Sequence, residues 1–186
     1  MYKRCSIVGN GGILKDSGCG EEIDRADYVL RANLPSIRNF TDDAGKKTNF
    51  TTFNPSMISR RYNYDRTAFN KDLNEYQGIL MFSGTRNYTD FHAHVKQNTT
   101  LNVFLLDYTY LYSLKELWKF NKSVSSGLML FSLALTHCEE MHLFGFWPFD
   151  TDEKDEVLIF VSLKEPVADQ IIPILLAKSW VKNHFW

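Results

Sequence analysis

Apolar residues recur along the chain in short runs, the length expected of buried β-strands. Most runs stop at glycine, proline or asparagine, which is typical of strands that end in turns. Residues 50–53, for example, alternate apolar and polar side chains and stop at Asn54 and Pro55, because proline cannot donate into a sheet. We predict strands over residues 5–8, 28–30, 50–53, 78–82, 101–106 and 141–146.

Segments with helical spacing lie between the later strands. Residues 65–76 and 109–120 place apolar side chains on one face, and residues 125–136 are apolar nearly all round, which predicts a buried helix. Strands that alternate with helices favour an α/β fold, with a mostly parallel sheet and helices on both faces. We find no internal repeat or low-complexity linker and expect one domain.

The charge balance narrows the function. Lys and Arg together number 21 and Asp and Glu 22, for a net charge of −1 in 186 residues. This balance gives no electrostatic reason to expect a nucleic acid or an anionic membrane surface as partner. The longest apolar stretch, residues 127–135, is too short to span a membrane. The chain enters its first strand pattern directly after Met1, so we expect a soluble chain without signal peptide or anchor.

Asparagine sequons are unusually frequent. With 13 Asn and 25 Ser plus Thr in the chain, chance placement predicts about two Asn-x-Ser/Thr sequons. Five occur, which favours a chain that meets the glycosylation machinery of the secretory pathway, although any single sequon is as well explained by chance. The candidate glycosylation sites are Asn39, Asn49, Asn87, Asn98 and Asn121.

The chain has three cysteines, Cys5, Cys19 and Cys138, whose spacing fits no zinc site. An oxidising lumen would permit a disulfide and leave one thiol over, whereas three buried thiols are the alternative. A glycine turn at residues 9–12 follows the first strand and could cradle a phosphate. It is not a full dinucleotide fingerprint, because Leu14 replaces the third glycine and no carboxylate ends the second strand. A purely structural turn is the alternative.

Two further segments could contact a nucleotide. Ser125, Ser126 and Gly127 open the buried helix, where hydroxyls and the positive end of the helix dipole could hold an anion. A plain helix cap explains the same residues. The aromatic residues within 145–149 could stack on a base or close the core.

These segments resemble the two sialylmotifs of animal sialyltransferases. Residues 4–150 carry the resemblance, and the Gly-Asn-Gly-Gly-Ile-Leu and Asn-Pro-Ser sequences are most similar to the α-2,8 branch, whereas residues 62–124 match loosely. The segments similar to the large motif are 4–14, 17–24, 28–35, 45–49 and 53–56, and those similar to the small motif are 125–129 and 138–149.

The resemblance implies a Rossmann-like α/β fold and a Golgi type II membrane glycosyltransferase. Such an enzyme transfers sialic acid from CMP-sialic acid to a sialylated glycolipid or glycoprotein acceptor in α-2,8 linkage, with inversion and without a metal. It also implies a disulfide between Cys5 and Cys138. The family's second disulfide would pair Cys19 with a cysteine near the C-terminus, which this sequence lacks, so we expect a free thiol at Cys19. The implied donor-binding residues are Asn10 and Asn33 near the phosphate, Ser125, Ser126 and Gly127 at the CMP moiety, and Gly145, Phe146 and Trp147 along the nucleotide pocket.

The chain departs from the family after residue 150. We therefore predict a partial catalytic domain over residues 1–150 and a divergent tail over 151–186. The resemblance implies that a motif with adjacent His and Tyr should follow, and then a His followed by a Glu, with that later histidine as the catalytic base. The tail has no adjacent His-Tyr pair, and His184 is followed by no acid, so we expect the catalytic base to be missing. The alternative function is an inactive nucleotide-sugar-binding fragment or a partner of an intact enzyme. The other histidines, expected in core or surface roles, are His92, His94, His137 and His142.

Overall fold

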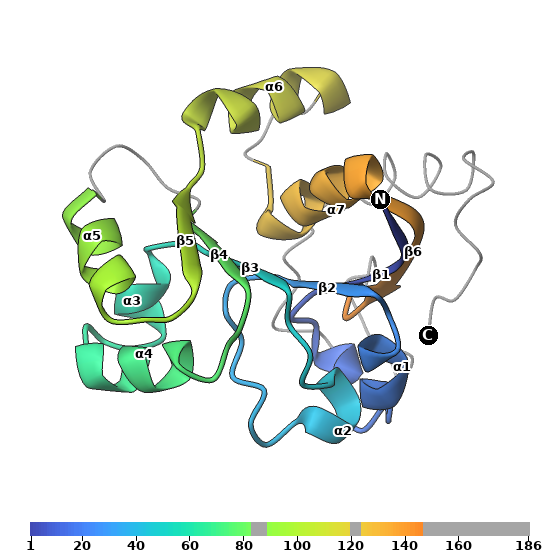
Figure 1. The fold of residues 1–186 in the computed structure, drawn as a ribbon, viewed down its shortest axis with the longest axis horizontal. Helices are drawn as coiled ribbons and strands as arrows, with labels where there is room; N and C mark the ends of the chain where they lie inside the picture. Colours follow the sequence, from blue (N-terminus) through green and yellow to red (C-terminus); the bar gives the residue numbers. More distant parts are fainter. Residues whose placement is uncertain (83–88, 120–123, 147–186) are drawn as a thin grey trace.

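The computed structural model describes residues 1–82, 89–119 and 124–146 and shows a sheet of six parallel strands in the order β5-β4-β3-β2-β1-β6 (Figure 1). Each neighbouring pair of strands is parallel. All six strands overlap the predicted ones, since each is an apolar run that ends at a turn. The strands are β1 Tyr2–Val8, β2 Tyr28–Arg31, β3 Phe50–Phe53, β4 Ile79–Phe82, β5 Asn102–Leu105 and β6 Cys138–Phe144.

Helices cover both faces of this sheet, as the alternating pattern predicts. On one face lie α6 and α7, and on the other the remaining helices (Figure 1). Beyond the three predicted helices, the described residues form four more and a 3₁₀ turn, η1. The helices are α1 Gly20–Asp24, α2 Thr41–Ala44, α3 Met57–Arg60, α4 Arg66–Leu73, α5 Thr89–Gln97, α6 Tyr108–Trp118 and α7 Ser126–His137, with η1 at Gly12–Leu14.

The glycine turn after β1 does not lead directly into an α-helix. It continues into η1, and α1 begins only at Gly20. The turn therefore has no α-helix N-terminus of its own. The N-terminus of α7 lies beside this edge instead, because Ser126 bonds Asn33.

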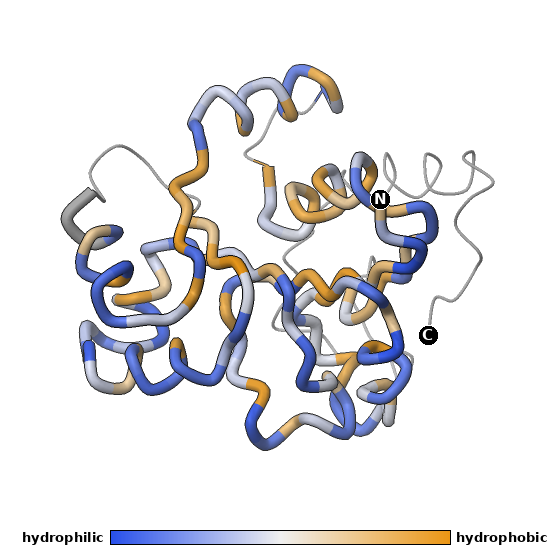
Figure 2. Tube along the Cα trace, viewed as in Figure 1, coloured by the Kyte–Doolittle hydropathy of each residue, from blue (hydrophilic) through white to orange (hydrophobic). Residues whose placement is uncertain are grey.

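The core divides by face. Helix α7 packs Leu128, Leu130 and Phe131 onto β1 and β2, and it is buried along most of its length, as its apolar sequence predicts. Figure 2 shows hydrophobic residues concentrated along the strands and α7. Under β3, β4 and β5, aromatic residues from the strands and α4 form a second cluster, in which Phe53, Phe69 and Phe82 are fully buried.

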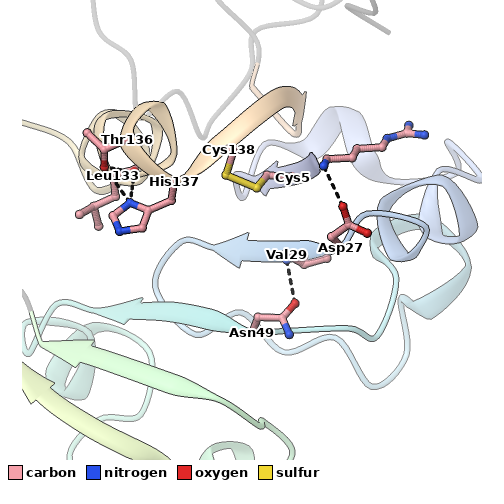
Figure 3. Close-up of a disulfide and its surroundings, with 9 residues drawn as sticks. Cys5, Asp27, Val29, Asn49, Leu133, Thr136, His137 and Cys138 are labelled. Carbon is pink, nitrogen blue, oxygen red and sulfur yellow. Dashed lines mark hydrogen bonds between the residues drawn. A yellow bond between two sulfur atoms is a disulfide. The ribbon is translucent and has the colours of Figure 1, made fainter. Parts of the chain in front are cut away.

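A disulfide joins the two longest strands, β1 and β6. The Cys5 and Cys138 sulfurs are 2.03 Å apart, and their Cα atoms are separated by 6.0 Å (Figure 3). The pairing is the one that the resemblance to sialyltransferases implies. Cys19 is a free thiol in the structure, as expected.

Candidate nucleotide-binding edge

The candidate site lies where β1, β2 and β6 end and α7 begins. In a parallel sheet the carboxyl ends of all strands meet at one edge, and ligands bind outside that edge. The glycine turn runs beside the end of β6, because the Gly9 amide donates to the Phe144 carbonyl at 2.7 Å and the Gly11 amide to the Gly145 carbonyl at 2.9 Å. These bonds draw the ends of the first and last strands together.

Asn10 and Asn33 connect the strand ends to α7. The Asn10 side-chain amide donates to the Ala32 carbonyl at 2.8 Å. One residue further on, the Asn33 side-chain oxygen accepts a hydrogen bond from the Ser126 hydroxyl at 3.1 Å. Residues separated by 93 positions in the sequence thus meet at this edge. Two of the predicted donor-binding side chains, Asn33 and Ser126, are thus in contact, and the third, Asn10, bonds the residue before Asn33.

Ser125 caps α7. Its backbone is extended, and its hydroxyl accepts from the Leu128 amide at 3.2 Å. The N-cap role expected as the plain alternative is therefore present. The first amides of a helix have no intrahelical acceptor, and the dipole places partial positive charge there. The N-terminus of α7 thus offers donors to an anion beside Asn33 and Ser126.

Glycine permits the close approach of backbone at this edge. A Cβ on Gly9 would lie 2.6 Å from the Gly145 carbonyl oxygen, and Gly145 itself has φ of +71°. A Cβ on Gly127 would lie 2.6 Å from Cε1 of Phe146. The Phe146 ring therefore packs directly over the start of α7, where the turn and the helix meet, and against the core below it.

Arg31 is the charged residue nearest to Asn33 in β2, but its guanidinium has a structural role. The side chain is fully buried, and it donates to the carbonyls of Ala44 (2.6 Å) and Lys47 (2.9 Å) and to the Thr48 hydroxyl (2.9 Å). Burial lowers the pKa of Arg31, and nearby Tyr76 and Asp24 oppose that shift. The polar groups described at the edge are thus neutral amides and hydroxyls.

Sequence reasoning missed two buried hydroxyls behind Asn33. The Asn33 amide donates to Thr52 Oγ1 at 3.0 Å, and the Leu34 amide to Thr51 Oγ1 at 3.3 Å. In the sequence, both threonines belong to the alternating pattern of a predicted strand. The sequence feature that points to them is the adjacent pair Thr51 and Thr52 in β3, the strand next to β2, which leads to Asn33.

The other candidate residues fall in several places. Trp147, Asn87, Asn121 and His184 lie outside the described residues. Asn39 and Asn98 are exposed. Asn49 uses its side-chain oxygen to accept the Val29 amide at 2.8 Å (Figure 3).

The described histidines are distributed over α5, α7 and β6. His137 ends α7, at the opposite end of the helix from Ser126, and its Nδ1 lies 2.7 Å from the Thr136 hydroxyl (Figure 3). His142 Nε2 lies 2.7 Å from Glu140 Oε1. His92 and His94 lie on α5. In the described ranges, no three His, Cys, Asp or Glu side chains form a group that could hold a metal ion. Within the same ranges, no helix combines the length and apolar character needed to cross a membrane.

A parallel sheet with helices on both faces, and with a glycine turn and a helix N-terminus at its carboxyl edge, defines the class of Rossmann-like α/β folds. The chain belongs to glycosyltransferase family 29, the sialyltransferases, whose family model matches residues 1–158. The predicted family is therefore confirmed.

Curated relatives extend this assignment. An alpha-N-acetylneuraminide alpha-2,8-sialyltransferase of Xenopus tropicalis is 40% identical over 166 residues, which cover 81% of this chain and 48% of that protein. Alpha-2,8-sialyltransferase 8E of Homo sapiens is 41% identical over 166 residues, which cover 80% of this chain and 44% of that protein. The chain spans about half the length of the curated relatives it matches.

Solved structures agree on the fold. A mammalian sialyltransferase matches with a TM-score of 0.66 at 21% identity, over 97% of this chain and 68% of that chain. A sialyltransferase in complex with CMP matches with a TM-score of 0.51 at 21% identity, over 88% of this chain and 65% of that chain. The predicted Rossmann-like α/β fold is confirmed.

Proposed function

We propose that this protein transfers sialic acid from CMP-sialic acid to a sialylated glycan in α-2,8 linkage, and that the edge described above binds the donor. The observation that carries the proposal is the hydrogen bond between Ser126, at the N-terminus of α7, and Asn33, next to the Ala32 carbonyl that accepts from Asn10. The residues that we assign to donor binding are Asn10, Asn33, Ser125, Ser126, Gly127, Gly145, Phe146 and Trp147.

The chemistry at this edge concerns the leaving group. When the bond between the anomeric carbon and the phosphate oxygen breaks, CMP departs with additional negative charge. Neutral donors and the positive end of α7 stabilise this charge more in the transition state, where it develops, than in the bound donor. They therefore lower the barrier to transfer. The described residues offer this stabilisation through fixed dipoles and hydroxyls, in keeping with a metal-independent reaction.

The acceptor side of the reaction needs a general base to take the proton of the attacking hydroxyl. The sequence-based expectation that this chain lacks that base stays a prediction, as does the division at residue 150. Among the described histidines, His137 lies at the far end of α7 from Ser126. We therefore do not assign His137 as the base for a donor bound beside Ser126.

The α-2,8 linkage and the location rest on the relatives. Both relatives described above are named as α-2,8-sialyltransferases, which supports a sialylated glycolipid or glycoprotein as acceptor. Membership of the sialyltransferase family supports the lumenal side of the Golgi membrane. The exposed sequons at Asn39 and Asn98 suit glycosylation in that lumen.

Calorimetric titration of the chain with CMP and with cytidine tests the donor site. Because the edge offers donors to an anion, CMP should bind about tenfold more tightly than cytidine. Ser126→Ala should reduce that preference, whereas Ser59→Ala, a matched change on α3, should not. Absence of saturable CMP binding, or equal affinity for CMP and cytidine, would overturn the proposed site.

Incubation with CMP-sialic acid tests transfer. We expect CMP binding without turnover from the 186 residues, because a missing base costs about 10²–10⁴-fold in rate. Turnover on an acceptor that ends in sialic acid would support the linkage and contradict the expected loss of the base. Turnover confined to an acceptor that ends in galactose would overturn the linkage.

A further inference from the structure

The chain leaves β2 through two consecutive residues in the left-handed region. Asn33 has φ of 58° and Leu34 has φ of 47°. Asparagine adopts this conformation readily, but leucine does so rarely, so the bend stores local strain. Such a conformation persists only where surrounding contacts hold it. The bend therefore needs partners outside β2.

Buried hydroxyls on β3 hold the two amides of the bend. Thr52 Oγ1 accepts from the Asn33 amide at 3.0 Å, and Thr51 Oγ1 accepts from the Leu34 amide at 3.3 Å. Both threonines are fully buried. Successive side chains of a strand point to opposite faces of the sheet, so the two hydroxyls reach the bend from opposite faces.

The carbonyl side of the bend is held as well. Arg61 donates to the Leu34 carbonyl, and its guanidinium lies 3.3 Å from Asp72 Oδ2. The Leu34 side chain is fully buried in the aromatic cluster around Phe53. With its amides and its carbonyl bonded, the bend is attached to β3 and to the loop after α3.

The bend determines where the Asn33 side chain points. That side chain accepts from the Ser126 hydroxyl at 3.1 Å, and its direction follows from the backbone that Thr52 holds. We propose that Thr52 is a positioning residue of the nucleotide-binding edge. Its hydroxyl bonds the backbone amide of Asn33 and holds Asn33 in the left-handed conformation that directs its side-chain oxygen toward Ser126. This inference rests on the proposed donor site.

Two substitutions of Thr52 separate its hydroxyl from its shape. Thr52→Val keeps the volume and removes the acceptor, whereas Thr52→Ser keeps the acceptor. The matched control is Ser6→Ala, which removes another fully buried hydroxyl, one that donates to the Ile23 carbonyl at 3.1 Å. Calorimetry with CMP gives the dissociation constant, and urea unfolding gives the stability of each variant.

We expect Thr52→Val to weaken CMP binding about tenfold and Thr52→Ser to restore it to within about threefold of the wild type. Ser6→Ala should lower stability and leave the dissociation constant unchanged. In an Asn33→Ala background, Thr52→Val should weaken binding no further, because it acts through Asn33. Unchanged affinity in Thr52→Val, failure of serine to restore it, or additive effects would overturn the inference.

Nuclear magnetic resonance separates this inference from the proposed function. If the wild-type chain does not bind CMP, the donor site fails, yet the Asn33 side-chain amide resonances should still shift in Thr52→Val and stay in place in Ser6→Ala. Unshifted Asn33 resonances would overturn the positioning role by itself. Should Thr52→Val not fold, amide exchange in the wild-type chain replaces it. The backbone amide proton of Asn33 should exchange slowly with solvent, and still more slowly when CMP is bound. Fast exchange would overturn the positioning role.

Discussion

The two ends of the sheet are built differently. The site half, which comprises β1, β2, β6, α1 and α7, contains the two seven-residue strands and the disulfide. The far half, which comprises β3, β4, β5 and α3 to α6, has strands of four residues. In the site half, glycine lets backbones approach closely. In the far half, large rings fill the space between the sheet and its helices.

The aromatic packing of the far half is extensive. The Phe53 ring lies 5.1 Å from that of Phe69 and 5.6 Å from that of Phe82, centroid to centroid. Such rings bury much apolar area but leave little room for a ligand beside the backbone. At its edge the site half instead has polar groups, namely the side-chain amides of Asn10 and Asn33 and the N-terminus of α7. The proposed ligand contacts thus lie in the site half, and the threonines of β3 join that half to the aromatic packing of the far half.

This comparison also explains where the sequence resemblance is specific. The two motifs lie mostly in the site half, whereas residues 62–124, which match loosely, form most of the far half. Close backbone contacts tolerate few side chains, because a Cβ on Gly9 or Gly11 would lie 2.6 Å from the Gly145 carbonyl oxygen. A hydrophobic core accepts many combinations of similar volume. The site half is therefore the part whose function can be read from its residues.

The largest expected effect comes from the disulfide, because it ties the site half across 133 residues of sequence. Replacing both Cys5 and Cys138 by alanine should lower the free energy of unfolding by about 4 kcal/mol, since the unfolded chain regains the freedom of that loop. Urea unfolding measures this loss. Cys19→Ala, at the free thiol, is the control and should change stability by less than about 0.5 kcal/mol. A loss below about 1 kcal/mol in the double variant would show that packing alone holds β1 to β6.

The next effect tests whether the halves are separable. Leu73 on α4 is fully buried in the far half, and Leu73→Ala should cost about 3 kcal/mol. At a temperature where this variant remains folded, its affinity for CMP should equal that of the wild type. Leu117 on α6 is 71% exposed, so Leu117→Ala should be nearly neutral. Loss of CMP binding in folded Leu73→Ala would contradict the division into two halves.

A smaller loss should follow a single added methyl in the glycine turn. Gly9→Ala places a Cβ 2.6 Å from the Gly145 carbonyl oxygen, which should cost about 2 kcal/mol as the two strand ends separate. Three residues on, a Cβ at Gly12 meets no atom within 4 Å, so Gly12→Ala should stay within about 0.5 kcal/mol of the wild type. Thermal unfolding of the two variants gives the difference. Equal stability of the pair would mean that the turn can relax away from β6.

Much of the fold could be predicted from the sequence, and the reasons are local. The six strands are apolar runs with turn residues at their ends, and α4, α6 and α7 are long enough to show helical spacing. Helices α1, α2 and α3 have four or five residues, too few for any periodicity. Helix α5, Thr89–Gln97, is also absent from the prediction.

Part of the candidate site was equally predictable. The meeting of Asn10, Asn33 and Ser126 follows from the rule that strand ends and helix starts share one edge. The hydrogen bonds from the bend to Thr51 and Thr52 do not follow from any such rule. They depend on the left-handed backbone of Leu34, a conformation that a leucine in the sequence gives no reason to expect.

The smallest effect is a change in local hydrogen bonding with pH. It distinguishes the loop at Asp16 and Gly18, near the glycine turn, from Asp107, which caps α6. Asp43 on α2 accepts the amides of Asp16 and Gly18, each at 2.9 Å, and these bonds lower the pKa of its carboxyl below 3.8. A carboxyl with a depressed pKa stabilises the folded state at pH values above its unfolded pKa, and this stabilisation is lost as the pH falls through the folded value. In the far half, hydrogen bonds from Thr109 lower the pKa of Asp107 in the same way.

The amide proton shifts of Asp16 and Gly18 should therefore titrate below pH 3.8, together with the Asp43 carboxyl and independently of the Thr109 amide. Asp43→Asn should abolish the titration of the first two amides and leave that of Thr109 intact, because the two carboxylates bind different loops. Nuclear magnetic resonance over a pH series measures both. A midpoint at or above 3.8 would contradict the lowered pKa of Asp43. A common transition of all three amides would mean that acid unfolds both loops together.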